Sequence, residues 1–417
     1  MHRTDNLTPR SIGLGLLLGL CIGGTAQAND DEKPMFTFAS YGTLALTYSS
    51  EDKAEYNSSL LSSGGVGDSQ SWGGEVDSRI GAQLTSNLGN DFSAVVQLVF
   101  ERRYDSSWQP TVEWANVKYQ LNPDFKLRLG RIALPNFLDA DYRKVAYATP
   151  WVRMPVELNN LVPITNSDGL DLNYRQRWGE VQNTIQAAVG TAKIRYPGNG
   201  HANVSAIRAI SDTLEYGNFK LRLSYSRANL DLDLADDLWN GFRQFGPPGT
   251  AIADRYSGHN KRVRFYGIGA NYDPGNWFAT AEYGRTTPNN FLGDRTGWYV
   301  GGGVRLNAWT PYATIAGSSV LSATSDPGLD TRRLPPNAAA VANVLNDSLN
   351  YLLQSRGPQR TYSLGLRYDL SRNTDLKFQI DRVVLPNNSA GYLWNRRDDY
   401  VPGRAYHVLT FSLDFTY

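Results

Sequence analysis

Residues 405–417 read AYHVLTFSLDFTY, and their side chains alternate in character with a period of two. Leu409, Phe411, Leu413 and Phe415 fall on one side of this pattern, which ends on Tyr417. The other side is mostly polar. Since successive side chains of a β-strand point to opposite faces, the pattern predicts a strand with one apolar and one mainly polar face. The last residues of a soluble domain usually fray, so a terminal strand that ends on an aromatic residue is informative.

The amino terminus predicts export. Arg3 and Arg10 precede a short apolar run, and the small residues Ala26 and Ala28 follow it. A basic segment, a short apolar segment and small residues at a cleavage site are typical of a secretory signal peptide. The apolar run is shorter than the ~20 residues of a spanning helix. We therefore predict a signal peptide at residues 1–28.

The mature chain, residues 29–417, contains no cysteine, because the single Cys21 lies in the signal peptide. This excludes disulfide scaffolds, thiolate metal sites and cysteine nucleophiles. The mature chain keeps 39 of the 41 basic and 39 of the 40 acidic residues, so it is formally neutral and suggests no nucleic-acid partner. With 24 Tyr, 10 Trp and 39 Gly but no long apolar run, the composition is typical of a transmembrane barrel.

Alternating segments recur along the whole mature chain, joined by seven short turns and eight longer loops in alternation. A chain that crosses a membrane repeatedly has reason to keep one side short and the other long. Unpaired sheet edges are excluded in lipid, so the sheet must close. We therefore predict an all-β fold, a transmembrane antiparallel β-barrel of about sixteen strands with short periplasmic turns and long external loops. The candidate strands are residues 35–48, 75–86, 92–104, 112–121, 125–132, 168–176, 181–191, 203–216, 219–230, 261–272, 277–285, 297–306, 309–316, 359–370, 375–384 and 405–417.

The two faces of each predicted strand differ as lipid and water would require. Between residues 363 and 370, leucine and tyrosine alternate with Ser363, Gly365, Arg367 and Asp369. In a membrane barrel the apolar set faces lipid and the polar set lines the lumen. Aromatic residues near strand ends are then expected to form interfacial girdles. These residues are Tyr48, Tyr119, Tyr225, Tyr272, Trp277, Tyr283, Trp298 and Tyr417.

Several segments resemble Gram-negative porins of the sixteen-stranded superfamily. They are Gly130-Arg131 at the end of the fifth strand, the turn at residues 87–91, the segment 362–370 (YSLGLRYDL) and the terminal Phe415-Thr416-Tyr417. Residues 139–157 also resemble the segment after the fifth strand in porin-like proteins. The resemblance covers essentially the whole mature chain and implies a passive, water-filled outer-membrane channel for small hydrophilic solutes and ions. It further implies a homotrimer in outer-membrane lipid, with Phe415 and Tyr417 as the signal read by the barrel-assembly machinery.

Porins of this type fold their third loop into the barrel, which places residues 133–167 at the narrowest part of the pore. A sixteen-stranded barrel is too wide for side chains alone to fill, so charges on such a loop would act at short range. The predicted constriction residues are Asp139, Asp141, Arg143, Lys144, Arg153 and Glu157. The predicted wall residues are Lys118, Arg128, Arg222, Arg305, Arg367, Lys377, Glu101 and Glu113, with Glu282 and Asp381 also inward by parity. The excess of Arg and Lys on the wall predicts a slight anion preference.

A substrate-specific channel is the closest alternative. Residues 337–356 have apolar positions at helical spacing, so a helix there could lid the pore or simply pack on neighbouring loops. Trp239, Phe242 and Phe245 could form a platform for a ligand, although scattered loop aromatics are the commoner case.

An outer-membrane enzyme or an adhesin is a more distant alternative. The mature chain has His201 and His259 in predicted loops and His407 on the lipid-facing side of the last strand. No G-x-S-x-G elbow accompanies them. The pairs Asp236-Asp237 and Asp398-Asp399 lack the spacing of a calcium loop. The sequence therefore predicts no catalytic residues, no metal and no cofactor.

Overall fold

The computed structural model describes residues 35–417, apart from residue 90 and residues 355–356 and 387–388. The predicted signal peptide lies outside the described residues. In the described part, sixteen long strands form one antiparallel sheet. They are β1 (Phe36–Ser49), β5 (Arg79–Gly89), β6 (Phe92–Glu101), β7 (Thr111–Gln120), β8 (Phe125–Ala133), β9 (Asn166–Trp178), β10 (Val181–Tyr196), β11 (Gly200–Tyr216), β12 (Phe219–Leu232), β13 (Lys261–Tyr272), β14 (Trp277–Thr287), β15 (Arg295–Val304), β16 (Trp309–Val320), β17 (Gln359–Ser371), β18 (Thr374–Val384) and β19 (Tyr406–Thr416).

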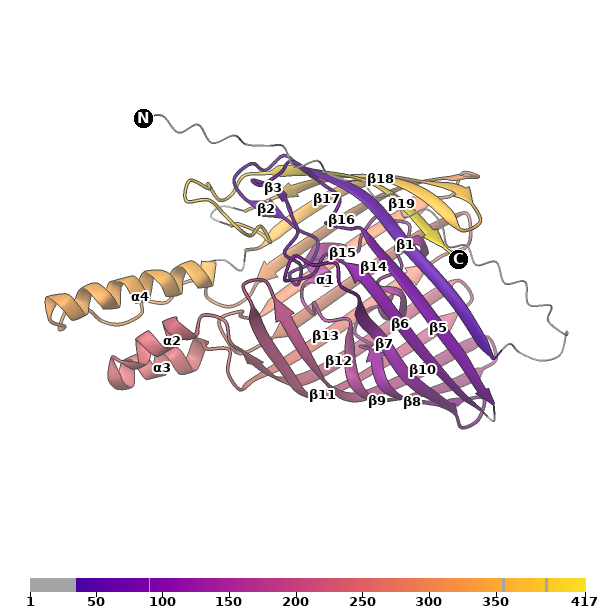
Figure 1. Ribbon diagram of the computed structural model, residues 1–417, viewed down its shortest axis with the longest axis horizontal. Coiled ribbons are helices and arrows are strands. Elements are labelled where there is room, and N and C mark those ends of the chain that lie inside the picture. Colours follow the sequence, from indigo (N-terminus) through magenta and orange to yellow (C-terminus); the bar gives the residue numbers. More distant parts are fainter. Residues whose placement is uncertain (1–34, 90, 355–356, 387–388) are drawn as a thin grey trace, which may run out of the picture. The chain divides into compact units, whose positions relative to one another are not determined.

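The sheet closes on itself through its first and last long strands. Each long strand pairs with its neighbours in sequence, and β1 pairs with both β5 and β19. Nine residue pairs join β1 to β19, from Tyr41 opposite Thr416 to Ser49 opposite Val408. Figure 1 shows the indigo β1 beside the yellow β19. Among the described long strands no sheet edge is left unpaired, as a bilayer requires.

The predicted fold class is confirmed, since each of the sixteen predicted strands overlaps one observed strand. The structure differs between β10 and β11, where the expected longer loop is a tight turn at residues 197–199. Gly198 has φ 86° and Asn199 has φ 60°, and two successive residues with positive φ fit the turn of a short hairpin. Both strands therefore extend to the turn.

The faces of the barrel are divided as predicted. On the outer face Leu364 is 64% exposed and Leu223 is 48% exposed, whereas Ser363 and Gln379 on the inner face are below 8%. Aromatic side chains meet across neighbouring strands near both ends of the apolar band, with ring centroids 4.3–5.3 Å apart. These pairs are Tyr48–Trp72, Phe92–Tyr119, Phe125–Tyr174, Tyr225–Tyr266 and Tyr272–Trp277. Five of the eight residues predicted for the interfacial girdles take part in these pairs, and their position at the membrane interface stays a prediction.

Two glycines make room for aromatic rings on either side of β1. Gly42 faces β19 across the closing seam, and Gly81 lies on β5, the other neighbour of β1. A Cβ on Gly42 of β1 would lie 2.4 Å from the ring of Phe415, and a Cβ on Gly81 of β5 would lie 2.1 Å from the ring of Tyr41. The terminal Phe415 therefore packs over the backbone of β1 on the outer face. The absence of a side chain at Gly42 makes room for it.

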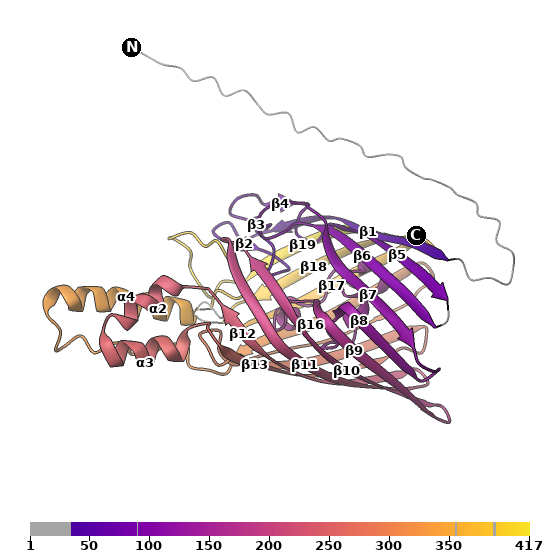
Figure 2. The same cartoon turned by 60° about the horizontal axis from the view of Figure 1, so that its bottom comes forward.

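Three helices pack together beyond one end of the strands (Figures 1 and 2). They are α2 (Asp236–Arg243) and α3 (Gly246–Tyr256), between β12 and β13, and α4 (Pro336–Gln354), between β16 and β17. Trp239 and Phe242 of α2 are fully buried in one apolar cluster with Leu349 and Leu353 of α4. The predicted helix thus packs on a neighbouring loop, and two of the three aromatics of the proposed platform are buried. Within the described residues, no helix has the length and apolar character needed to cross a bilayer.

Two further loops cover the same end of the barrel, which we call the long-loop end. The first carries β2 (Glu55–Tyr56), β3 (Val66–Gly67) and β4 (Trp72–Gly73). Glu55 forms a backbone bridge to Trp394 in the last loop. An apolar cluster that includes Tyr56, Leu393 and Tyr406 holds the two loops together.

The first testable prediction concerns sidedness. The long-loop end should be external and the turn at residues 273–276 periplasmic, because porin-like barrels keep their short turns inside. Since the mature chain has no cysteine, Asn276→Cys provides a single label site. It should resist an impermeant maleimide too large for the pore on intact cells, and Ser59→Cys in the first loop should react. Labelling of Asn276→Cys on intact cells would overturn the orientation.

Candidate functional site: the loop inside the barrel

Residues 134–165, which join β8 to β9, fold into the barrel, and we call them the inner loop. They contain the short helices η1 (Ala140–Tyr142), η2 (Ala146–Ala148) and α1 (Val156–Asn159), the last of which Figure 1 labels within the barrel. The segment lies within residues 133–167, the stretch predicted to be the third loop, and its role as the constriction stays a prediction. Hydrogen bonds tie its first half to the wall. Ser224 on β12 donates to the Asn136 carbonyl at 2.7 Å, and the Leu138 amide donates to Glu282 on β14 at 2.9 Å.

Apolar packing adds to these hydrogen bonds. The Trp151 ring meets Phe278, Tyr299 and Tyr312 of the wall edge-on, with centroids 5.9–6.3 Å apart. These side chains belong to one buried cluster with Leu158. Edge-to-face aromatic pairs stabilise by about 0.5–1.5 kcal/mol beyond the area they bury. The inner loop therefore lies against the β12–β18 side of the wall.

Arg153 fixes the middle of the inner loop. Its guanidinium forms ion pairs with Asp77 at 2.7 Å and with Asp381 on β18 at 2.8 Å, and it also donates to Tyr56 at 3.2 Å and to Thr410. The Arg153 side chain is only 6% exposed. Burial by itself would lower the pKa of Arg153, but the carboxylates of Asp77 and Asp381 outweigh it and raise that pKa above the usual range. Arg153 is thus a charged anchor between the loop and the wall.

Glu157 fixes the end of the inner loop. Its carboxylate, 1% exposed, accepts hydrogen bonds from Gln359 at 2.7 Å and from Thr361, both on β17. Burial raises the pKa of Glu157, although these two donors oppose the shift. Gly297 on β15 makes the approach possible, since a Cβ there would lie 2.1 Å from the Glu157 carbonyl oxygen.

Lys377 on β18 holds the backbone of the inner loop. Its ammonium donates to the carbonyls of Ala146 at 2.7 Å, Thr149 at 2.8 Å and Trp151 at 3.3 Å. Asp414 on β19 balances its charge at 2.9 Å. The Lys377 side chain has no exposed surface, so it supports the loop and does not meet solutes.

Arg143 braces the inner loop internally. It donates to the Asn159 side chain at 2.6 Å and to the carbonyls of Val162 and Ile164 at 3.1 Å, with the Phe137 ring 4.9 Å below. Burial lowers the pKa of Arg143 to about 10. Arg143 therefore closes one turn of the loop onto another.

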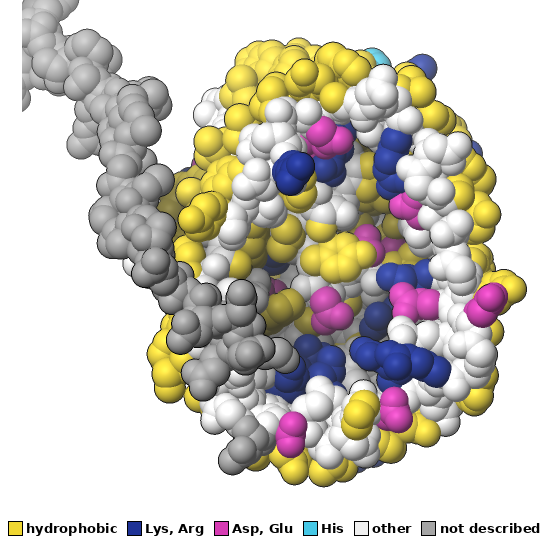
Figure 3. All heavy atoms as spheres, turned by 90° about the vertical axis from the view of Figure 1, so that its right-hand side faces the viewer, with side chains coloured by type: hydrophobic (Ala, Val, Ile, Leu, Met, Phe, Trp, Pro, Cys, Tyr) yellow, Lys and Arg dark blue, Asp and Glu magenta, His cyan; other side chains and the backbone are white. Residues whose placement is uncertain are grey.

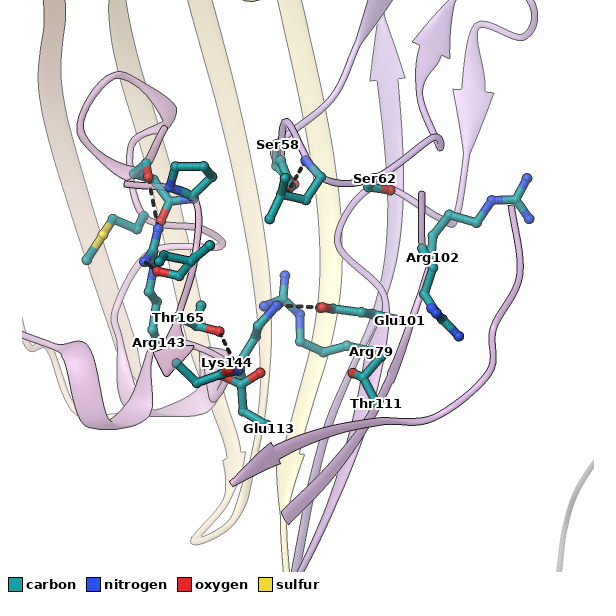
Figure 4. Close-up of a pocket in the computed structure, with 18 of the residues that line it drawn as sticks. Ser58, Ser62, Arg79, Glu101, Arg102, Thr111, Glu113, Arg143, Lys144 and Thr165 are labelled. Carbon is teal, nitrogen blue, oxygen red and sulfur yellow. Dashed lines mark hydrogen bonds and ion pairs between the residues drawn. The ribbon is translucent and has the colours of Figure 1, made fainter. Parts of the chain in front are cut away.

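A cavity of about 480 Å³ remains between the inner loop and the opposite side of the barrel. Its lining includes Arg79 of β5, Glu101 of β6, Glu113 of β7 and Lys144 of the inner loop. Figure 4 shows these four side chains gathered, with an ion pair joining Lys144 to Glu101. Charges of both signs thus gather in the cavity, and the Lys144–Glu101 pair bridges it.

The barrel is also hollowed at the short-turn end. Figure 3 shows Lys, Arg, Asp and Glu side chains lining this hollow. On the inner face of the wall, Lys118 lies opposite Arg128, and Arg128 lies opposite Asp171. The Nε and Nη2 groups of Arg128 each donate a hydrogen bond to the Asp171 carboxylate. Arg222, further round the wall, donates to Ser211 at 3.0 Å.

The inner loop adds negative charge to this region. Asp141 is exposed and acts electrostatically on Lys126, Arg128 and Arg222. Asp139 accepts a hydrogen bond from Tyr142, and burial raises the pKa of Asp139 despite that bond. Wall cations and loop carboxylates thus face one another.

The structure divides the predicted site residues into three groups. Lys144, Asp139, Glu101 and Glu113 line the cavity. Lys118, Arg128, Arg222 and Asp141 belong to the hollow at the short-turn end. Arg143, Arg153, Glu157, Lys377 and Arg367 support the inner loop, the last by donating to the Tyr147 carbonyl at 2.8 Å. Arg143 and Arg153 also line the cavity.

One predicted wall residue lies elsewhere. Arg305 follows β15 and pairs with Asp273 at 2.6 Å, at the rim of a short turn. Sequence reasoning missed Arg79, Asp77 and Lys126. Arg79 and Asp77 share the inward parity of their predicted strand, so that signal was present. Among the described residues, no group of three or more His, Cys, Asp or Glu side chains could hold a metal ion.

Comparisons with known proteins agree with this geometry. The family described as Gram-negative porin matches residues 16–387. The anion-selective porin of Comamonas acidovorans is similar in structure, with a TM-score of 0.52, 13% identity and coverage of 92% of this chain and 99% of that one. The channel DcaP of Acinetobacter baumannii has a TM-score of 0.53 and 11% identity, with coverage of 91% of this chain and 97% of that one. OmpF of Salmonella typhi has a TM-score of 0.52 and 12% identity, with coverage of 92% of this chain and 97% of that one. No curated protein matches the chain in sequence. At these identities, structural likeness establishes the fold alone.

Proposed function

Because the chain belongs to the family of Gram-negative porins, we propose that its channel passes small hydrophilic solutes between the inner loop and the β5–β10 side of the wall. The observation that supports this route is the uneven anchoring of the inner loop, which reaches the β5–β10 side through the Lys144–Glu101 ion pair but is held far more extensively at β12–β18. Arg153, Glu157 and Lys377 join the loop to β17, β18 and their neighbours, where the side chains leave little space. The cavity of about 480 Å³ lies on the other side.

A modest anion preference is part of the proposal. Lys118, Lys126 and Arg222 face water in the hollow at the short-turn end, and no carboxylate within ion-pair distance of any of them is found among the described residues. Such cations raise the local concentration of anions near the constriction. The loop carboxylates Asp139 and Asp141 limit the effect, so strong selectivity is not expected.

A substrate-specific channel remains the alternative, and no single observation favours it. Trp239 and Phe242 are fully buried, which leaves them no surface for a ligand. The helix α4 packs on α2.

We also propose that residues 1–28 direct export and that Phe415 and Tyr417 serve as the assembly signal. Porins are typically trimeric, and OmpT of Vibrio cholerae, similar in fold, is described in a trimer form, so a homotrimer is proposed.

The second testable prediction concerns ion preference. Replacing Lys118 and Lys126 by glutamine should shift the reversal potential in a KCl gradient toward cation permeation. Two charges about 4 Å from a passing ion are each worth about 1 kcal/mol in water, or about fivefold each, so the permeability ratio should change by up to about 30-fold at low salt. The shift should fade near 1 M salt, where the Debye length is about 3 Å.

Planar-bilayer recordings would check this result, with Arg332→Gln plus Arg333→Gln in an external loop as the charge-matched control. Both arginines are exposed, and their loop between β16 and β17 is remote from the inner loop in sequence. An unchanged reversal potential in the Lys118/Lys126 variant would contradict the proposed role of the wall cations.

A further inference from the structure

Three arginines stand side by side on the outer face of β11, β12 and β13. The strand register places Arg227 directly opposite Arg208 on one side and directly opposite Arg264 on the other. We call these three residues the basic ladder. Arg262 lies two residues beyond Arg264, on the same face of β13.

The basic ladder faces lipid and not the lumen. Two residues nearer the short-turn end, the same faces carry Ile210, Tyr225 and Tyr266, of which Ile210 is 49% and Tyr266 45% exposed. The residues of opposite parity are Ala209 and Phe265, which are buried inside at 6% and 2%. Arg208 and Arg227 are exposed and Arg264 is partly exposed.

The depth of the basic ladder can be read from the girdles. Phe219 and Tyr225 of β12 are six residues apart, about 20 Å of strand, and each meets an aromatic of β13 or lies opposite one. Tyr and Trp in a membrane barrel sit at the boundary between hydrocarbon and headgroups. Arg227 lies one more step outward from Tyr225. Because barrel strands tilt by about 35–45°, Arg227 lies about 20 Å above Phe219 across an apolar band about 25 Å tall, and its long side chain extends the guanidinium outward to headgroup level at the long-loop end.

The ladder has no internal counter-charge. Among the described residues, no carboxylate forms an ion pair or hydrogen bond with Arg208, Arg227 or Arg264. The two nearest carboxylates on this face of β11 and β12 are already engaged. Asp212 accepts from Asn183 at 2.6 Å, and Asp231 lies 2.6 Å from His259. Like charges directly opposite each other on neighbouring strands destabilise a sheet. An anionic partner would remove this repulsion.

We propose that the basic ladder binds the phosphate groups of a phosphorylated glycolipid in the outer leaflet. Guanidinium presents a planar fork of donors that matches phosphate oxygens, and it is less strongly hydrated than ammonium. The acyl chains of the same lipid would lie along the apolar face that Ile210, Tyr225 and Tyr266 form below the ladder. A free phosphate ion would gain the first of these contacts but not the second.

The test uses the folded full-length mature protein in detergent and native mass spectrometry with diphosphoryl lipid A as the probe. The wild type should retain the lipid. Arg208→Gln/Arg227→Gln/Arg264→Gln should weaken retention on the order of 100-fold, since each surface arginine contributes about fivefold toward an anionic headgroup. The corresponding triple lysine variant should bind more tightly than the glutamine triple but less tightly than the wild type, because it keeps the charge and loses the planar donor fork. Arg332→Gln/Arg333→Gln/Arg396→Gln in the external loops should be neutral. Inorganic phosphate at equal concentration should not displace the lipid.

Heat-modifiable migration verifies that each variant folds, and unchanged conductance separates this proposal from the channel function. Equal lipid retention by the glutamine triple would overturn the proposal. Displacement by inorganic phosphate would reassign the ladder to free phosphate. A glutamine triple that keeps the lipid but becomes monomeric would assign this face to a second copy of the chain.

Discussion

Replacing Arg153 by methionine should lower the free energy of unfolding by about 3–5 kcal/mol, because it leaves two buried carboxylates without their cation. Asp77 and Asp381 are 2% and 3% exposed, so water cannot replace the guanidinium fully. Methionine keeps much of the length of the side chain, which limits the loss of packing. The inner loop should detach first, so single-channel currents should become larger and noisier before the barrel itself unfolds.

The control for this prediction removes all three charges together. In Arg153→Met/Asp77→Asn/Asp381→Asn no buried charge is left unpaired, and replacing a complete buried ionic cluster is often close to neutral. Thermal unfolding followed by heat-modifiable migration, with bilayer recordings of both variants, would provide the comparison. If the single and triple variants lost equal stability, charge imbalance would not be the cause. Quiet, wild-type currents from Arg153→Met would show that Arg153 does not hold the loop.

Changing Tyr417 to aspartate should remove most of the folded protein from the outer membrane. The Tyr417 side chain is 81% exposed, so it contributes little packing to the finished barrel. Its backbone exchanges two hydrogen bonds with Ser40, at 2.7 and 2.8 Å, and the aspartate variant keeps both. A charge at the lipid interface costs only ~0–1 kcal/mol. A large loss of yield would therefore report recognition during assembly and not the stability of the folded state.

Thr416→Ser is the matched control at the same end of β19, and it should assemble normally. Deletion of Tyr417 should resemble the aspartate variant, with an added loss from the two missing backbone bonds. The measurement is the amount of heat-modifiable barrel in purified outer membranes at equal expression. Equal amounts from Tyr417→Asp and Thr416→Ser would count against an assembly signal at Tyr417.

The strands could be predicted from sequence because the alternating side-chain pattern and the turn residues that bound each strand are both local. The bounds predicted for β13 match the observed ones, because its alternating pattern ends at the Asp-Pro-Gly-Asn turn of residues 273–276. In the structure Asn260, with φ 52°, precedes the strand. Failure at the tip of β10 had a local cause too. Pro197 and Gly198 resemble the middle of a loop in sequence, although they form a tight turn between two long strands.

The roles of the charged loop residues could not be predicted, because the partners that define them are remote. Arg153 and Lys144 look alike as basic residues of one loop. Their difference depends on Asp77, Asp381 and Glu101, which lie 76, 228 and 43 residues away from them. Only the closed barrel brings these carboxylates to the loop. The same holds for α4. The helical spacing of its apolar residues predicted a helix, but it could not predict that these residues would pack on Trp239 and Phe242 of α2.

The Arg153 anchor of the inner loop also implies an order of events during folding of the barrel. Arg153 needs Tyr56 and Asp77 from the beginning of the mature chain and Asp381 and Thr410 from its end. Strands β18 and β19 must therefore be in place beside β1 before the anchor can form. The inner loop, also held at β12, β14 and β17, gains this last anchor only when the barrel is sealed. A chain arrested with an open seam would therefore hold its inner loop without the Arg153 anchor.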